Sequence, residues 1–165
     1  MHRLRRARLC VVGVILLALA ACSGAAPVDS GKVADEVKGA AHQLAAYNAH
    51  DAAKAVSFDA LDYVGMFHGG PVVSGPAADL AAMEQQVADS AVRFDLADEK
   101  VDVAGSGEFA VYRARYAYRF TDPKTKAVMV ERGNWAAAFR RQGDGSMKLV
   151  WTMGADAGPV VPGNQ

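Results

Sequence analysis

The stretch FAVYRARYAYRFT, residues 109–121, decides the fold that we predict for this chain. Its even positions carry apolar or aromatic side chains: Ala110, Tyr112, Ala114, Tyr116, Tyr118 and Phe120. Three of its odd positions carry arginine, at 113, 115 and 119. Successive side chains of a strand point to opposite faces of a sheet, so this alternation predicts a strand with one buried and one solvated face.

Further strands are predicted on both sides of this stretch, separated by turns rich in glycine, proline and aspartate. They are expected at residues 63–68, 72–73, 91–103, 127–141 and 147–154. The phase of the alternation changes near Asp98-Glu99, which predicts a bulge or bend there. The second half of the chain is therefore predicted to be a meander of antiparallel strands.

Helices are predicted before most of these strands. One helical face carries apolar residues at spacings of three and four: Val33, Val37, Ala40, Leu44 and Tyr47. Asp51 can cap a second, short helix at 52–57, and Pro76 is placed to begin a third. Helices followed by antiparallel strands indicate an α+β domain.

A short apolar run near the N-terminus predicts an export signal. Four arginines precede residues 9–21, and these 13 residues are fewer than the roughly 20 that a membrane-spanning helix needs. A basic start, a short apolar core and small residues predict a signal peptide at 1–21. Its end, Leu19-Ala20-Ala21-Cys22, resembles the bacterial lipobox, which implies cleavage before Cys22 and acylation of its sulfur, palmitate included. The alternatives are an ordinary signal peptide and an uncleaved anchor.

The predicted cut divides the chain into a signal peptide (1–21), a lipidated tether (22–31), a folded domain (32–157) and a flexible tail (158–165). Cys10 would be removed, so no intrachain disulfide is expected. The remaining 144 residues hold 14 basic and 18 acidic side chains, a net charge of −4, which argues against nucleic-acid binding. Ser23 after the cysteine favours the periplasmic face of the outer membrane, with the inner membrane as the alternative.

The order of elements resembles the nuclear transport factor 2-like superfamily, in particular its SnoaL-like and ketosteroid-isomerase-like branch. The resemblance covers about Val33 to Asp156, and its strongest parts are Tyr47-Asn48-Ala49-His50-Asp51, Gly75-Pro76 and the strand that contains Lys148-Leu149-Val150-Trp151. It implies a cone of N-terminal helices packed on a strongly curved, mainly antiparallel sheet, with an apolar cavity at the open end. Such proteins include isomerases, cyclases and dehydratases as well as non-catalytic members, and many dimerise through the sheet.

The resemblance also shows which isomerase residues this chain lacks. Met66 occupies the place of the carboxylate base, Gln43 lies near the place of the phenol donor, and Asn134 replaces the neutral acid. Because a thioether and an amide cannot exchange a proton as these groups do, ketosteroid isomerase chemistry is not expected.

The predicted ligand pocket contains Tyr47, Val64, Met66, His68, Tyr116, Arg132 and Asn134. His68 is placed near the mouth, where it is a candidate general base with Asp62 as its partner; the simpler interpretation is a solvated rim histidine. Glu131 and Arg132 must point to opposite faces, and an inward Asn134 would bring Arg132 inward, where it would suit an anion.

Trp135 and Phe139 would then lie on the other face with Arg113 and Arg115, as parts of a subunit interface. No histidine or acid pair has metal-ligand spacing and no phosphate-binding loop is evident, so neither a metal nor a cofactor is predicted.

We therefore hypothesise a membrane-tethered exported lipoprotein whose cone-shaped domain binds a small apolar ligand or a protein partner without catalysis. A homodimer through the sheet is a further expectation. The alternative function is a SnoaL-like isomerase, cyclase or hydratase that uses His68 as general base.

Overall fold

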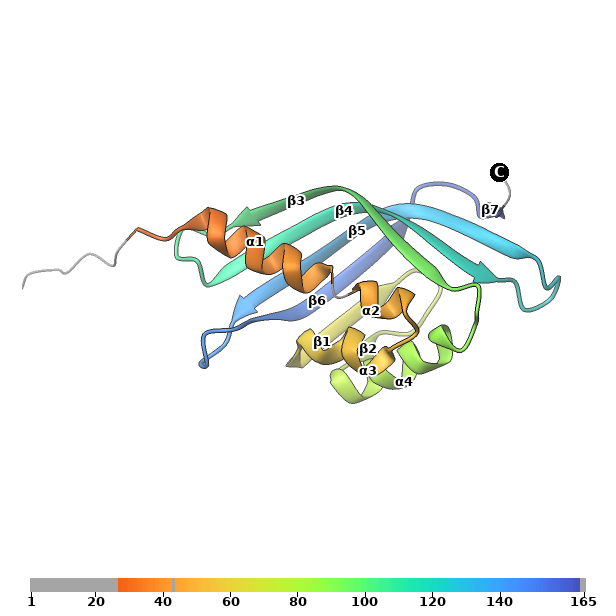
Figure 1. Cartoon of the computed structure of the whole chain (residues 1–165), viewed down its shortest axis with the longest axis horizontal. Coiled ribbons are helices and arrows are strands. Elements are labelled where there is room, and N and C mark those ends of the chain that lie inside the picture. The colour runs from red at the N-terminus through yellow and green to blue at the C-terminus, as the bar shows by residue number, and fades with distance from the viewer. Residues whose placement is uncertain (1–26, 43, 164–165) are drawn as a thin grey trace, which may run out of the picture.

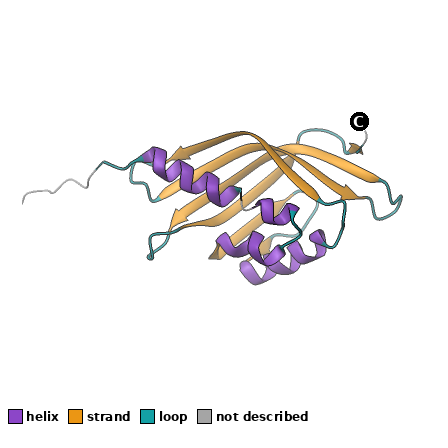
Figure 2. Ribbon diagram, in the orientation of Figure 1, coloured by secondary structure: helices purple, strands orange, loops and turns teal. Residues whose placement is uncertain are grey.

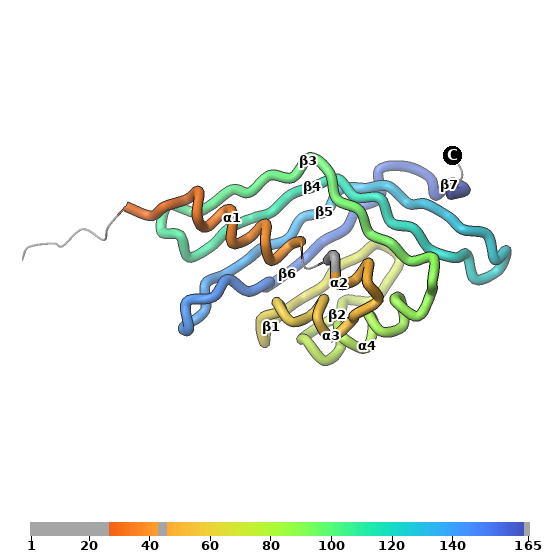
Figure 3. Tube along the Cα trace, in the orientation of Figure 1, coloured from red at the N-terminus to blue at the C-terminus, as the bar shows by residue number. Residues whose placement is uncertain are grey.

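The computed structural model describes residues 27–42 and 44–163, and in this part of the chain helices cover one face of a curved sheet (Figure 1). Figure 2 shows the helices together on that face, and the tube in Figure 3 follows the twist of the long strands. We call the helix-covered face the inner face and the opposite one the outer face. The predicted signal peptide, Cys22 and Gln43 lie outside the described residues. No helix of the described part is long and apolar enough to cross a bilayer.

The helices are α1 (Ser30–Ala41), α2 (Leu44–Asn48), α3 (Ala52–Ala55), a single 3-10 turn (Val56–Phe58) and α4 (Pro76–Val87). The apolar face predicted for one helix is thus shared by α1 and α2. Asp29 caps α1 by accepting from the Lys32 amide at 3.0 Å. The predicted Asp51 cap of α3 is confirmed, since its carboxylate accepts from the Lys54 amide at 3.0 Å.

The described strands form one seven-stranded sheet in the order β2-β1-β6-β5-β4-β3, with β7 beside β5. Their bounds are β1 Asp59–Phe67, β2 Val73–Ser74, β3 Arg93–Val103, β4 Phe109–Thr121, β5 Val128–Arg141, β6 Met147–Asp156 and β7 Val161–Pro162. β1 runs parallel to β6, and every other pairing is antiparallel. This architecture confirms the predicted α+β cone.

Irregular pairings help the sheet to curl. The β3–β4 register shifts between Ala97 and Lys100, where Asp98 has a φ of 55°. The bulge predicted at Asp98-Glu99 is therefore present. Two more shifts lie between Asp59 and Val64 in β1 and between Ala138 and Phe139 in β5. An extra residue in one strand increases the local twist and bends it, so these bulges wrap the sheet toward the helices.

The core lies between α1 and the inner face of β3–β6. As predicted, the alternate residues of β4 point inward, and Tyr112 is fully buried together with Val37 of α1. Trp135 and Phe139 also belong to this core, so their predicted place in an interface on the outer face is wrong. The register explains this, because Trp135 pairs with Ala114 and Phe139 with Ala110, both inward residues of β4. Burying large side chains of this kind contributes about 1.5–3 kcal/mol each.

The segment predicted as a flexible tail returns to the sheet. After β6 ends, residues 157–160 form an arch, and β7 then takes the place of β6 beside β5, where Val161 pairs with Val130. Hydrogen bonds fix both ends of the arch region: the Ala157 amide donates to the Arg132 carbonyl and the Gly163 amide to the Val128 carbonyl, each at 2.8 Å.

Candidate functional site

The predicted pocket residues are divided between the two faces of the sheet. Tyr47 and Tyr116 are buried on the inner face. Val64 and Met66 lie on the outer face, because they pair with Trp151 and Met153 of β6, and the inward residues of β1 are Tyr63, Gly65 and Phe67. The bulge between Asp59 and Val64 sets this phase.

Arg132 and Asn134 also lie on the outer face, the reverse of their predicted orientation. The glycine between them explains why. Gly133 pairs with Tyr116 and lies against its ring, so closely that a Cβ at 133 would be 2.5 Å from it. A strand alternates its faces, so the neighbours of Gly133 must point outward. Glu131, two residues before Gly133, therefore faces inward.

Four polar side chains meet at the open end of the inner face, and we call them the mouth cluster: His68, Tyr116, Glu131 and Asp156. His68 follows the last residue of β1 and starts a turn. Its Nε2 lies 3.4 Å from Glu131 Oε2, and its Nδ1 lies 3.6 Å from Asp156 Oδ1. The Tyr116 hydroxyl donates to Glu131 Oε1. One residue each from β4, β5 and β6 and one from the turn after β1 thus form the mouth cluster.

Burial differs across the mouth cluster. The Glu131 side chain is 13% exposed, whereas those of His68 and Asp156 are 48% and 51% exposed. Burial and the hydrogen bond to Glu131 hold the pKa of Tyr116 well above its ordinary value, so this phenol stays a neutral donor. Glu131 is therefore the buried member of the cluster, whereas solvent reaches both His68 and Asp156.

Asp62, the predicted partner of His68, pairs with Arg140 instead. Its carboxylate accepts two hydrogen bonds from Arg140 Nη2, at 2.8 and 2.9 Å, and this pair is exposed. The hydrogen bond from Arg140 lowers the pKa of Asp62 below its ordinary value. The acids that do approach His68 are Glu131 and Asp156, which sequence reasoning did not assign to it. Only the strand register brings them to the same point.

Aromatic rings occupy the space below the mouth cluster. The Phe94 ring stacks on Tyr116 with centroids 5.2 Å apart, and it meets Trp135 and Tyr47 edge-on at 6.0 and 6.4 Å. Tyr47 donates from its hydroxyl to Gln86 Oε1 at 2.9 Å. Burial raises the pKa of Tyr47 far above its ordinary value, so it too is a hydrogen-bonding group and not a base.

A second group of acids, missed in the sequence, lies between β1 and α4. Asp79 is only 5% exposed, and Asp59 is its acidic neighbour. Burial and the neighbouring Asp79 charge raise the pKa of Asp59 to about 8, so Asp59 is mostly protonated at neutral pH. Burial also raises the pKa of Asp79. Asp79 stands in the first turn of α4, where the helix dipole favours a negative charge.

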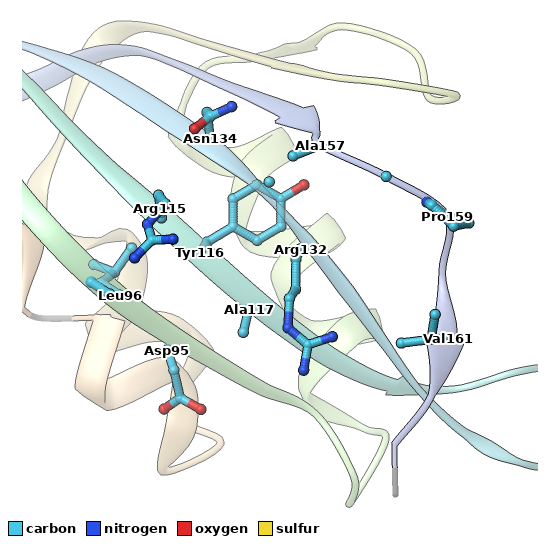
Figure 4. Close-up of a pocket in the computed structure, with 13 residues that line it drawn as sticks. Asp95, Leu96, Arg115, Tyr116, Ala117, Arg132, Asn134, Ala157, Pro159 and Val161 are labelled. Carbon is cyan, nitrogen blue, oxygen red and sulfur yellow. The ribbon is translucent and has the colours of Figure 1, made fainter. Parts of the chain in front are cut away.

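Two hollows of the described part lie on the outer face. The larger measures about 550 Å³, and we call it the outer groove (Figure 4). Its floor is formed by β3, β4 and β5, and one wall is the arch. Residues that line it include Asp95, Arg115, Ala117, Arg132, Asn134 and Pro159. The smaller hollow, about 400 Å³, lies beside it, and Arg115 and Asn134 line both. Among the described residues no trio of His, Cys, Asp or Glu is arranged to hold a metal ion.

Comparisons with known proteins give matches in structure and none in sequence. No family model matches the chain, and no curated protein matches it. Similar structures include a hexachlorocyclohexane dehydrochlorinase, LinA-type3, from Novosphingobium barchaimii, with a TM-score of 0.69 and 11% identity over 81% of this chain and 90% of that one.

Two further similar structures have slightly higher identity. A ketosteroid isomerase-like protein from Erwinia carotovora has a TM-score of 0.63 and 18% identity over 76% of this chain and 96% of its own. An NTF2-like protein with a cystatin-like fold from Novosphingobium aromaticivorans has a TM-score of 0.62 and 18% identity over 74% and 80%. The strand order, the helix-covered inner face and these similarities agree, and the chain has the nuclear transport factor 2-like fold.

Proposed function

We infer that this chain is an exported lipoprotein, anchored to the cell envelope through Cys22, whose cone-shaped domain binds a small apolar ligand or a protein partner without catalysing a reaction. One observation supports the inference that the domain does not catalyse a reaction. The groups at the mouth that could move a proton face each other: both ring nitrogens of His68 point at carboxylates, and Glu131 also accepts from Tyr116. A general base needs a nitrogen directed at its substrate.

The residues that the resemblance aligned with the isomerase base and acid supply neither group. Met66 and Asn134 are not acids, and both lie on the outer face, where they cannot reach a substrate on the inner face. The binding role is supported by exposed apolar side chains on and beside β1. Leu61 is 93% exposed, Phe67 lies next to His68 at the mouth, and Val72 precedes β2. Of these, Phe67 lies at the mouth of the inner face, where its exposed ring can contact an apolar ligand or partner.

The experiment that tests binding is native mass spectrometry of the protein purified from its own host. We expect a mass above that of the protein and its acyl chains, which dissociates as one small molecule or one protein. A matched comparison uses His68→Gln, which should retain the bound molecule and leave the cellular phenotype unchanged. An unliganded wild type, together with a phenotype lost in His68→Gln, would overturn this function.

The lipid anchor is tested by Cys22→Ala. Because this change removes the sulfur that would be acylated, we expect the variant to leave the membrane fraction and to lose the mass of the acyl chains. Ala21→Val, which alters the residue before the expected cut, is a useful companion, since valine at that position should slow processing while leaving Cys22 in place. Acyl chains found on neither wild type nor variant would contradict the anchor.

A second candidate function, a SnoaL-like isomerase, cyclase or hydratase, is supported by the 3.4 Å approach of His68 to Glu131. A carboxylate beside an imidazole can orient it as a general base, provided that the ligand displaces Asp156 from the other nitrogen. Similar structures include a dehydrochlorinase and an isomerase-like protein, so enzymes occur among proteins of this fold. If this function is correct, His68→Gln and Glu131→Gln should each abolish turnover, and Asp62→Asn should not.

A further inference from the structure

We propose that the outer groove is a second binding site, separate from the mouth cluster, and that it takes a small organic anion with an apolar body whose acidic group pairs with Arg132. The site lies on the opposite face of the sheet from His68. It would therefore remain even if the function proposed for the mouth were incorrect.

The groove is built by the arch, which is held at both ends. The Ala157 amide donates to the Arg132 carbonyl at 2.8 Å, and Val161 pairs with Val130 in the β5–β7 ladder. The intervening residues therefore stand away from the sheet and wall the groove beside Arg132 (Figure 4). The volume of about 550 Å³ is within the range of about 300–1,000 Å³ that is usual for small-molecule sites.

Small and apolar side chains surround the guanidinium group of Arg132. Ala117 pairs with Arg132 across the β4–β5 ladder, so no bulky side chain stands beside it on the floor. Pro159 and Val161 of the arch side complete the apolar lining. Asn134, two residues along β5 on the same face, adds an amide that can donate to an acidic oxygen. The arrangement thus offers apolar walls with a few polar groups, as ligand sites do.

The charges of the outer face leave Arg132 available. Three arginines of this face are paired with acids: Arg93 lies 2.8 Å from Asp95, Arg113 lies 2.6 Å from Asp102, and Arg115 contacts Asp98. Arg119 forms no ion pair with a described residue, but it does not line the groove. Within the described residues, no carboxylate oxygen lies within 4.0 Å of the Arg132 guanidinium. The acid that lines the groove, Asp95, is already held by Arg93. An unpaired guanidinium in an apolar-walled groove is complementary to a carboxylate or phosphate group, which it can bind with two hydrogen bonds.

The test uses benzoate as the probe and benzamide as its neutral counterpart, titrated by calorimetry into the protein purified from its own host. We expect wild type to bind benzoate and to bind benzamide at least tenfold more weakly. Arg132→Met should weaken benzoate binding at least tenfold. Ala117→Phe, which fills the floor of the groove, should abolish it.

The matched control is Arg119→Met, which removes the same charge from the outer face of β4, outside the groove. It should change the affinity for benzoate less than twofold. If Arg119→Met and Arg132→Met lost the same affinity for benzoate, the effect would come from the overall charge of the face and not from a site at Arg132. That result would overturn the proposal. So would benzoate binding that is unchanged in both Arg132→Met and Ala117→Phe.

The competing occupant of this face is a second copy of the chain, since the expected homodimer through the sheet would cover the groove. Sedimentation velocity distinguishes the two. A protein that stays monomeric at high concentration and binds benzoate supports the ligand site. A dimer that does not bind benzoate and dissociates when Arg132 is replaced by glutamate would overturn it in favour of the interface.

Discussion

The two faces of β5 differ sharply at adjacent residues, Glu131 and Arg132. Glu131 points inward, is mostly buried, accepts a hydrogen bond from Tyr116 and faces His68. Arg132 points outward into the groove, where no described carboxylate reaches it. Burying a charge is costly unless it is paired and hydrogen-bonded, whereas a charge that water still reaches can remain free for a ligand. Glu131 on the inner face is thus held by partners within the fold, whereas Arg132 in the outer groove is left without an acid among the described residues.

Gly133, whose close packing on Tyr116 fixes the faces to which Glu131 and Arg132 point, should be the position most sensitive to substitution. Gly133→Ala would bring a Cβ to 2.5 Å from the Tyr116 ring and into contact with the Ala155 carbonyl. Because backbone and a packed ring cannot both move away cheaply, we expect a loss of about 3 kcal/mol in the free energy of unfolding, measured by urea denaturation. Gly158→Ala, in the arch, is the control, since an added Cβ there meets no atom within 4 Å. Equal stability of the two variants would contradict the packing described for the inner face.

Removing the inward charge should cost more than removing the outward one. Glu131→Ala leaves the buried Tyr116 hydroxyl without its acceptor, so we expect a loss of about 2 kcal/mol. Glu131→Gln keeps an acceptor oxygen and should lose less. Arg132→Met, on the other face, should stay within about 0.5 kcal/mol of wild type in the same urea titration. If Arg132→Met were as destabilising as Glu131→Ala, the contrast between the two faces would not hold.

The Asp59–Asp79 pair adds a third case to this comparison of buried and exposed charges. Here a buried carboxyl group avoids its charge by keeping its proton. The folded-state pKa of Asp59, about 8, is far above its ordinary value of 3.8, so between these pH values the folded protein binds more protons than the unfolded chain. The stabilising contribution is therefore complete below about pH 4 and is lost as the pH rises toward 8. The positive charge of Lys148 opposes the rise in the pKa of Asp59. Burial and the charges of the two acids in turn raise the pKa of Tyr63.

Asp59→Asn should remove this pH dependence. The amide is close in size to the carboxyl group but cannot ionise, so the decline in unfolding free energy between pH 5 and 8 should become smaller by about 1–2 kcal/mol, after allowance for partial exposure. Chemical denaturation of wild type and variant at four pH values measures this decline. A pH profile identical to that of wild type would show that the proton is not held at Asp59.

The smallest effect is expected at Asp62. Its exposed pairing with Arg140 is screened by water, so Asp62→Asn should not measurably change the denaturation midpoint between pH 5 and 8. Because Arg140 lowers the pKa of Asp62, any contribution of this pair is present above about pH 4 and lost only in more acidic solution. Loss of ligand binding or turnover in Asp62→Asn would contradict this placement. It would mean that Asp62 belongs to the functional site.

Much of the fold could be predicted because it depends on patterns among residues that are close in the sequence. The alternation in residues 109–121 predicted β4 with its bounds, the change of phase located the bulge at Asp98, and Asp51 was recognised as a helix cap. The inward and outward faces of β5 were predicted the wrong way round, because the prediction assumed that Asn134 points inward. Trp135, Ala137 and Phe139 alternate as well, and their burial decided the phase, since one aromatic side chain gains more from the core than an amide does.

The candidate site was less accessible to prediction for a physical reason. His68 was recognised as a residue near the mouth, but its neighbours Glu131 and Asp156 come from strands far along the chain. Their meeting depends on register, and a shift of one residue would send each of these side chains to the opposite face. The same holds for Asp59 and Asp79, which are joined only when α4 packs on β1.

By itself, the sequence determined the order of helices and strands, the inward residues of β4 and the caps and turns, because these depend on neighbours a few residues away. The tertiary structure alone decided which charges are paired and which are left free. Glu131 and Arg132 are adjacent in the chain and point to opposite faces of β5, so the packing on each face puts one beside an aromatic ring and the other beside the arch. Pairing energies depend on distance and burial, and both are properties of the folded molecule.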